Sequence, residues 1–318
     1  MFLLGTTGTI GRATAAALVT RGHEVVCLVR PKAGDPTRGL PDGVTVRHGD
    51  VTDAASLQRN GFRAERFDAL VSCLASRTGS PRDAWAIDHK AHVEALRLAQ
   101  AAGVRQVVLL SAICVPRPTL AFQQAKLAFE ARLIASGLTY SIVRPTTFFK
   151  SLSGQIDRVR RGKPFLLSGD GTLTACKPIS DADLAAYLAD CLDDATRANR
   201  ILPIGGPGEA ISPRHQGEAL FHTLGREPKF KSVPVGLLNA IIATLGLLGR
   251  ISPKLCDKAE LARIGRYYAT ESMLVLNPAT GRYAAQATPS TGQDTLFDFY
   301  ARILAGEAKV DLGAHSVF

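Results

Sequence analysis

The sequence predicts an α/β fold in which helices cover both faces of a doubly wound parallel sheet, with a smaller C-terminal lobe. One observation is that short apolar runs alternate with helical stretches as far as Pro145, which is the pattern of repeated strand-helix-strand units. The other is a glycine-rich turn, Gly5–Gly11, which lies between the first apolar run and the first helical stretch.

The predicted strands are short apolar runs bounded by turn residues. In chain order they are Phe2–Gly5, Glu24–Val29, Val44–Arg47, Asp68–Leu74, Gln106–Leu110 and Thr139–Val143. The helical stretches that connect them are Ile10–Arg21, Ala54–Asn60, Asp83–Ala102 and Ala121–Ser136. Beyond Pro145 the alternation loosens, but Arg200–Ile204 is predicted to return to the sheet as a further strand.

The glycine-rich turn has the spacing of a dinucleotide-binding loop. Gly5 would allow the tight turn after the strand, Gly8 would let a phosphate approach the backbone, and Gly11 would let the helix pack closely on the strand. Backbone amides at the start of a helix, together with the helix dipole, favour a pyrophosphate. We therefore expect cofactor contacts from Gly5, Thr7, Gly8, Thr9, Ile10 and Gly11.

The end of the second strand indicates which dinucleotide is bound. An acidic side chain there would accept a hydrogen bond from the ribose 2′-hydroxyl of NAD, but this chain has Arg30, with Lys32 close behind. A guanidinium binds a 2′-phosphate through two hydrogen bonds, whereas an acid would repel it. We expect NADPH as the cofactor of a Rossmann-type domain formed by residues 1–152 and the strand near 200–204. Residues 153–318 are expected to form mainly a substrate-binding lobe.

The remaining cofactor contacts are expected where later strands end. Asp50 follows the third strand, where it could contact the adenine edge or cap the following helix, and the two roles are compatible. The other expected contacts are Val51, Cys73, Leu74, Ala75, Ser111, Pro145 and Thr146.

This set of motifs resembles the short-chain dehydrogenase/reductase superfamily in its extended and atypical branches. The resemblance rests on the glycine turn, Asp50, Ser111, Lys126 and the run Arg144–Thr146. It implies that Lys126 is a catalytic residue that holds the nicotinamide ribose, and that a tyrosine four residues earlier donates a proton. In this chain the tyrosine is replaced by Phe122.

The missing tyrosine restricts the chemistry. A ketone reductase must stabilise an alkoxide as hydride arrives, usually with a positioned acid, and Phe122 has no proton to give. Either the protein is not an enzyme, or its hydride acceptor develops no alkoxide. A carbon–carbon double bond conjugated to a large π-system satisfies the second condition. A plain core role for Phe122 is compatible with both.

Four longer runs are similar to those of the divinyl chlorophyllide a 8-vinyl-reductase family of (bacterio)chlorophyll synthesis. They are Phe67–Arg77, Leu110–Val115, Gly169–Ser180 and Tyr267–Met273, and the last two are far more specific than the glycine turn. The resemblance covers nearly the whole chain. It implies NADPH-dependent reduction of the 8-vinyl group of divinyl chlorophyllide, or of the protochlorophyllide form, to ethyl.

The implied substrate is an anionic tetrapyrrole with a flat apolar face. Its propionate would suit a basic pocket, for which Arg160, Arg161, Lys163 and Lys177 are candidates. The proton donor stays unassigned between Tyr268 and bound water. Two alternatives remain open: a non-catalytic, NADP(H)-sensing regulator of the NmrA type, and an isoflavone-reductase-like enzyme acting on a smaller conjugated substrate.

Residues 232–249 contain no charged side chain and are rich in Leu, Ile, Ala and Gly. The stretch is slightly short for a membrane span, which needs about 20 predominantly apolar residues. We expect a buried or substrate-lining helix. Contact with the surface of the photosynthetic membrane is the alternative.

Composition narrows the class of partner. The formal net charge of +10 fits an anionic ligand, but the basic residues are scattered, so we expect no nucleic-acid partner. The six cysteines form no CxxC pair, which argues against a zinc site or a disulfide framework. His89 and His92 lack a third ligand, so we expect a solvated helical face and no metal site. No oligomeric state is predicted.

The compartment is predicted from the cysteines and the N-terminal residues. The cysteines are interpreted as reduced thiols, and Phe2–Leu4 already has the pattern of a strand rather than of a targeting peptide. We therefore expect a cytoplasmic protein, with attachment to the photosynthetic membrane left open.

Overall fold

The computed structural model describes residues 1–31, 39–248 and 252–308, so Lys32 lies outside the described residues. The chain divides into two compact units. The first comprises Met1–Arg77, Pro81–Pro145 and Asp181–Leu202, and the second comprises Thr78–Ser80, Thr146–Ser180 and Pro203–Phe318.

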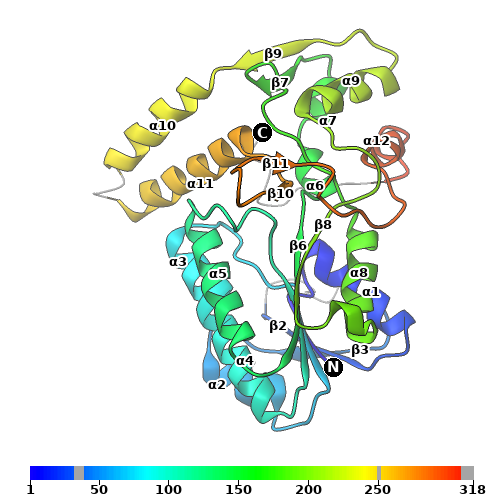
Figure 1. Cartoon of the computed structure of the whole chain (residues 1–318), viewed down its shortest axis with the longest axis vertical. Helices are drawn as coiled ribbons and strands as arrows, with labels where there is room; N and C mark the ends of the chain where they lie inside the picture. The colour runs from blue at the N-terminus through cyan, green and yellow to red at the C-terminus, as the bar shows by residue number, and fades with distance from the viewer. Residues whose placement is uncertain (32–38, 249–251, 309–318) are drawn as a thin grey trace. The chain divides into compact units, whose positions relative to one another are not determined.

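The central sheet has seven strands in the order β3-β2-β1-β4-β5-β6-β8 (Figure 1). They are β1 (Phe2–Leu4), β2 (Val25–Val29), β3 (Val44–His48), β4 (Ala69–Ser72), β5 (Gln106–Leu110), β6 (Thr139–Pro145) and β8 (Arg200–Ile204). All neighbouring pairs from β3 to β6 are parallel, and Phe2 lies opposite both Val26 and Leu70. The predicted α/β fold is confirmed, and so is the returning strand.

Helices cover both faces of this sheet (Figure 1). On one face α1 (Thr9–Thr20) packs against α8 (Asp181–Asp193). The other face carries α3 (Pro81–Ala84), α4 (His92–Ala101) and α5 (Ala121–Ile134). Helix α8 was not predicted from the sequence, although its buried positions, such as Leu184, Leu188 and Cys191, recur with helical spacing.

Two of the expected helices contain π-helical turns, in which backbone hydrogen bonds span five residues. The first begins as α2 (Ala54–Ser56) and continues as the π-helical segment Leu57–Phe62. The second runs from α3 to α4 through the π-helical segment Trp85–Ala91. Such turns occur frequently at functional sites, and Trp85–Ala91 carries an acidic residue, Asp88, that lies beside Lys126.

An aromatic cluster in the core of the first unit holds β1 in place. The Phe2 ring centroid lies 4.3 Å from that of Phe62 and 5.3 Å from that of Phe67. All three side chains are buried. Burial of one phenylalanine contributes roughly 1.5–3 kcal/mol, so the cluster fixes the strand from which the glycine turn begins.

The second unit has its own core, centred on Phe165, Phe221 and Tyr300. Strand β7 (Phe165–Ser168) pairs in parallel with β9 (Phe230–Val233), and β10 (Val275–Leu276) pairs antiparallel with β11 (Tyr283–Ala284). The helices of this unit are α6 (Phe149–Leu152), α7 (Ile156–Arg160), α9 (Pro213–Thr223), α10 (Val235–Leu248), α11 (Pro253–Thr270) and α12 (Leu296–Leu304).

The expected helix in the apolar stretch 232–249 is α10 (Val235–Leu248), but it is not buried; Ser232 and Val233 belong to β9, and Gly249 lies outside the described residues. It packs on α11, and its side chains Val235, Leu238, Ile242 and Leu245 are half-buried. No side chain described on α10 is fully buried. Among the helices in the described part of the chain, none is long and apolar enough to cross a membrane.

Candidate functional site

Two glycines of the turn between β1 and α1 are required by the protein itself. Gly5 has a φ of +83°, a conformation that is strained for residues with a side chain. A Cβ atom at Gly5 would lie 2.5 Å from the carbonyl carbon of Cys73, and one at Gly11 would lie 2.1 Å from the carbonyl oxygen of Gly5. These glycines therefore let the turn pack closely against the residues after β4 and against α1.

No contact with the described residues requires a glycine at the third position, Gly8. A Cβ atom at Gly8 would lie 3.5 Å from the carbonyl oxygen of Gly5, which is an ordinary contact. Gly8 is exposed between exposed Thr7 and Thr9, and it precedes α1 without a side-chain cap. The first turn of α1 carries no acidic residue. The uncovered helix N-terminus and the absent side chain fit the close approach of a pyrophosphate.

The turn lies where the strand order reverses, between β2 and β4 on either side of β1. Ligands of such sheets bind outside the carboxyl ends of the strands at this point. Cys73 and Leu74 are half-buried there and Ala75 is exposed, whereas Val51 after β3 is buried. Burial raises the pKa of the Cys73 thiol to about 11, so Cys73 is an uncharged part of this edge at neutral pH.

Arg30 follows β2 and is exposed. Partial burial acts to raise the pKa of Asp50, but hydrogen bonds from Thr52 and the charge of Arg30 lower it overall. The N–H and hydroxyl of Thr52 donate to Asp50 Oδ1 at 2.8 and 2.7 Å. The cap of α2 is Asp53, which accepts from the Ala55 N–H, so the capping role considered for Asp50 is wrong.

Lys126 lies on α5 and is buried with a counter-ion. Its Nζ is 3.2 Å from Asp88 Oδ1, and the two side chains are 10% and 0% exposed. Asp88 Oδ1 also accepts from the Ser76 N–H at 3.3 Å, while Oδ2 is buried without a hydrogen-bond partner among the described residues. Sequence reasoning missed Asp88. The available signal was an acidic residue between the apolar positions Ile87 and Ala91 of a predicted helix.

His92 lies beside this pair and is a buried, neutral histidine. Its Nδ1 donates to the Ile87 carbonyl oxygen, so Nε2 accepts from Ser72 Oγ, both at 2.8 Å. Burial, reinforced by the charge of Lys126, lowers the pKa of His92 to about 4. The prediction of a solvated helical face is therefore wrong for His92. His89, which was predicted to share that face, is half-buried. In the described chain no cluster of three or more His, Cys, Asp or Glu is placed to bind a metal.

The hydroxyl of Ser111, after β5, is held by a carboxylate. Ser111 Oγ donates to Glu130 Oε1 at 2.5 Å. Glu130 lies one helical turn beyond Lys126 on α5, is 2% exposed, and forms an ion pair with Arg144 of β6. Because an ionised carboxylate only accepts hydrogen bonds, the Ser111 proton points to Glu130.

Phe122 lies in the first turn of α5 and is half-buried. The adjacent Gln123 fixes the start of this helix, because its Oε1 accepts from the N–H groups of Thr119 and Leu120, both at 2.9 Å. The helix therefore begins at a well-held point, one turn before Lys126. The position of the expected tyrosine is occupied by a side chain that carries no acidic proton.

Pro145 ends the first unit's β6 and Thr146 begins the next segment of the second unit, and both are buried. The Thr146 hydroxyl donates to the carbonyl oxygen of Lys177. Lys177 Nζ in turn donates to the Thr288 carbonyl oxygen and to Ser290 Oγ, both at 3.1 Å. Lys177 is thus engaged within the second unit. The other basic residues proposed for a carboxylate are exposed: Arg160, Arg161 and Lys163.

The two most specific sequence runs, Gly169–Ser180 and Tyr267–Met273, are paired in the second unit. The Met273 N–H donates to the Ala175 carbonyl oxygen at 2.9 Å, and a β-bridge joins Cys176 to Met273. The second run also contains Tyr268, which is 45% exposed. The two runs are therefore joined to each other within the second unit.

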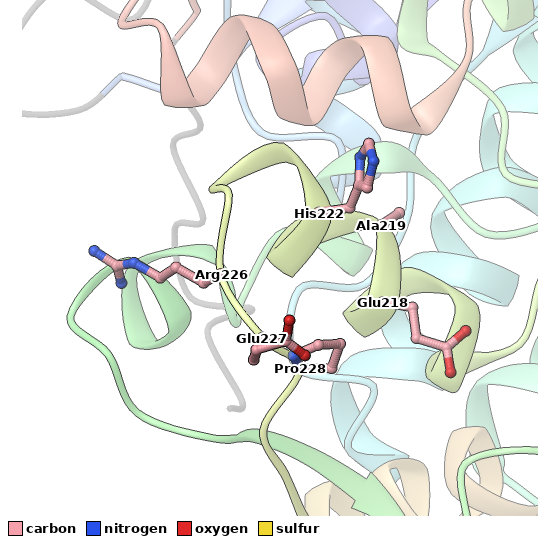
Figure 2. Close-up of a pocket in the computed structure, with 6 residues that line it drawn as sticks. All are labelled: Glu218, Ala219, His222, Arg226, Glu227 and Pro228. Atoms are coloured by element: carbon pink, nitrogen blue, oxygen red, sulfur yellow. The ribbon is translucent and has the colours of Figure 1, made fainter.

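A cavity of about 430 Å³ lies in the second unit (Figure 2). Its lining residues are Glu218, Ala219, His222, Arg226, Glu227 and Pro228. The Arg226 guanidinium points away from the cavity and donates to the carbonyl oxygens of Val159 and Arg160, at 3.2 and 3.0 Å. None of the site residues predicted from the sequence lines this cavity.

Comparison with known proteins agrees with a dinucleotide site. The model of the NAD(P)H-binding family matches residues 5–195. The chloroplastic divinyl chlorophyllide a 8-vinyl-reductase of Oryza sativa subsp. indica is 48% identical, over 100% of this chain and 82% of the relative. The protein of the same name from Zea mays is 47% identical with the same coverage.

A solved structure shares the fold. The NADPH-dependent quinone oxidoreductase of Escherichia coli, in complex with NADPH, superimposes with a TM-score of 0.67 over 95% of this chain and 99% of that chain. The two sequences are 18% identical. At this identity the likeness concerns the fold alone.

Proposed function

This chain belongs to the NAD(P)H-binding family and, within it, to the divinyl chlorophyllide a 8-vinyl-reductases, and from that premise we propose that it reduces the 8-vinyl group of a divinyl chlorophyllide to ethyl with NADPH. The names of the relatives supply the substrate class. The residues around Lys126 give a physical reason why the enzyme would reduce a carbon–carbon double bond rather than a carbonyl group.

One observation carries this proposal: Phe122 stands at the position where the superfamily has its proton-donating tyrosine. The Ser111 hydroxyl donates its hydrogen bond to Glu130, and the Phe122 side chain has no acidic proton. Reduction of a carbonyl needs a donor placed at the developing oxyanion. Reduction of a vinyl group conjugated to a macrocycle does not, because the negative charge spreads into the ring before carbon is protonated.

We assign cofactor binding to the edge of the sheet around the glycine turn. When bound there, NADPH supplies the hydride, and one proton from solvent completes the ethyl group. Gly8 and the N-terminus of α1 accommodate the pyrophosphate, and the exposed guanidinium of Arg30 binds the 2′-phosphate. Lys126, held by Asp88, donates hydrogen bonds to the nicotinamide ribose.

Substrate contacts are assigned by charge. A propionate carboxylate would be met by exposed cations, and Arg160, Arg161 and Lys163 remain exposed whereas Lys177 is engaged within its unit. We also propose that the protein works at a membrane surface, because the flat apolar face of a chlorophyllide favours transfer from water to lipid.

The test is turnover of a divinyl chlorophyllide with NADPH. Removal of a vinyl group from the conjugated system should shift the Soret band to shorter wavelength, and mass spectrometry should show the gain of two hydrogens. The matched control is Lys126→Met, which keeps the aliphatic stem but removes the ammonium. Absence of both signals with the folded wild-type protein, while NADPH binding is retained, would reject the function but leave the cofactor site standing.

A further inference from the structure

Helix α10 exposes a continuous apolar face. Leu237, Ile241 and Leu247 are 53%, 40% and 66% exposed, and Leu237 and Ile241, four residues apart, lie on one side of the helix. Thr244 lies between them, and its hydroxyl donates to the Ala240 carbonyl oxygen at 2.9 Å. This face therefore presents hydrocarbon and no hydroxyl group that needs a partner.

The exposure is concentrated at this place. Ten large apolar side chains of the described residues are exposed, and five of them belong to α10 and α11: Leu237, Ile241, Leu247, Leu261 and Tyr268. An exposed apolar patch on a monomer generally marks an interaction surface. Among the described elements of the second unit, α11 is the helix with which α10 makes extensive contact.

The charge around α10 indicates what covers it. Between Pro228 and Cys256 the sequence has no acidic residue, whereas it has four basic residues: Lys229, Lys231, Arg250 and Lys254. Lys229 and Lys231 are exposed on and beside β9, just before the helix. An uncharged apolar helix that follows exposed cations is the pattern of helices that lie in the interface of an anionic bilayer.

The length of α10 decides between lying on a bilayer and crossing it. Fourteen residues at about 1.5 Å per residue span roughly 21 Å, less than the roughly 30 Å of a hydrocarbon core. We propose that α10 docks on the surface of an anionic lipid bilayer, with Leu237, Ile241 and Leu247 inserted between the acyl chains. Lys229 and Lys231 then contact the lipid phosphates. This inference rests on the proposed membrane-surface function and names its partner.

Vesicle flotation tests the proposal on the full chain. The wild-type protein should float with vesicles of phosphatidylcholine and phosphatidylglycerol, but not with phosphatidylcholine alone, and high salt should weaken the binding. Leu237→Gln/Ile241→Gln should reduce the bound fraction at least tenfold. Lys229→Gln/Lys231→Gln should weaken binding about fivefold for each lysine removed. Wild-type protein that stays at the bottom of the gradient with anionic vesicles overturns the proposal.

Matched variants distinguish membrane docking from self-association and from substrate binding. Ile134→Gln removes an apolar side chain of comparable exposure from α5, and Lys90→Gln removes an exposed cation, so both variants should float like the wild type. If Leu237→Gln/Ile241→Gln floats normally but changes the oligomeric mass, the face is an interface between copies and the proposal is wrong. If it floats normally but raises the KM for chlorophyllide, the face binds substrate and the proposal is again wrong.

Turnover assays also separate docking from catalysis. Turnover of chlorophyllide dispersed in detergent should be the same in the wild type and in Leu237→Gln/Ile241→Gln. Protein that floats but does not turn over the substrate would refute the proposed reaction without touching the docking surface. Protein that turns over the substrate but does not float would refute docking alone.

Discussion

The buried pair of Lys126 and Asp88 gives the sharpest test of the site. We consider Lys126→Met, Asp88→Asn and the double variant, which remove the charges and nearly keep the volumes. At 3.2 Å and an effective dielectric constant of about 20, the attraction between the two charges is roughly 5 kcal/mol. Removal of one partner leaves a charge that is 10% or 0% exposed, so each single variant should lose about 3 kcal/mol of unfolding free energy.

The double variant decides whether the interaction is direct. Because no buried charge is left unpaired, it should lose about 3 kcal/mol less than the sum of the single losses. Urea unfolding followed by circular dichroism measures all four proteins under one condition. Losses that simply add would show that the two side chains do not interact, and would refute the ion pair as the means by which Lys126 is held.

The same four proteins test the cofactor role. If Lys126 binds the ribose and Asp88 only holds Lys126, then Lys126→Met should weaken NADPH binding by about 1.5–3 kcal/mol, the value of a charge-assisted hydrogen bond. Asp88→Asn should weaken NADPH binding when Lys126 is present and have almost no effect in the Lys126→Met background. Fluorescence titration of NADPH measures this. Unchanged affinity in a folded Lys126→Met variant would contradict the assignment.

Other positions give independent tests of the cofactor site and of the buried histidine. Arg30→Asp should weaken NADPH binding by about 1.5–3 kcal/mol and spare NADH, and equal losses in titrations of both cofactors would reject the 2′-phosphate contact. Gly8→Ala should fold normally but bind NADPH poorly. Gly11→Ala should instead lower the melting temperature, because its Cβ atom would lie 2.1 Å from the carbonyl oxygen of Gly5. A Gly8→Ala protein with normal NADPH affinity would argue against a pyrophosphate at the turn. Phe122→Tyr should leave vinyl reduction within a few-fold, and a gain in turnover of tenfold or more would mean that a proton donor was lacking. The pKa of His92 is about 4 in the folded protein and about 6.5 in the unfolded chain, so the unfolded chain binds a proton first as pH falls. The free energy of unfolding should therefore fall by up to about 3 kcal/mol between about pH 6.5 and about pH 4. Urea titrations across this range should show no such loss in His92→Gln.

The parallel sheet could be predicted because its signal is local. In runs such as Gln106–Leu110, the four residues after Gln106 are buried and apolar, so the run stands out from the helices between the strands. The glycine turn could be predicted because its three glycines lie in one short strand-turn-helix unit, although the contact that requires Gly5 comes from Cys73 after β4. Helix α8 was missed because it follows a stretch, 146–180, in which this alternation is lost.

The site was predicted less completely because it depends on side chains from separate elements. Both ends of the ion pair were in the sequence, but only Lys126 belonged to a familiar motif. The π-helical turn before His92 changes which residues of that helix share a face, and five-residue hydrogen bonding leaves no periodicity that sequence reasoning can detect. Glu130 was one turn from Lys126, yet only the fold shows that it reaches Ser111.

The hydrogen bond from Ser111 to Glu130 also bears on how this chain could change its chemistry. A mutation that restored a tyrosine at Phe122 would supply an acid, while Ser111 would still be turned toward Glu130 and away from any oxyanion. A mutation of Glu130 alone would free the serine but leave Arg144, its ion-pair partner, unpaired in a largely buried position. Each single mutation therefore either destabilises the protein or leaves its chemistry unchanged. Conversion to a carbonyl reductase requires coordinated changes at Phe122, Glu130 and Arg144.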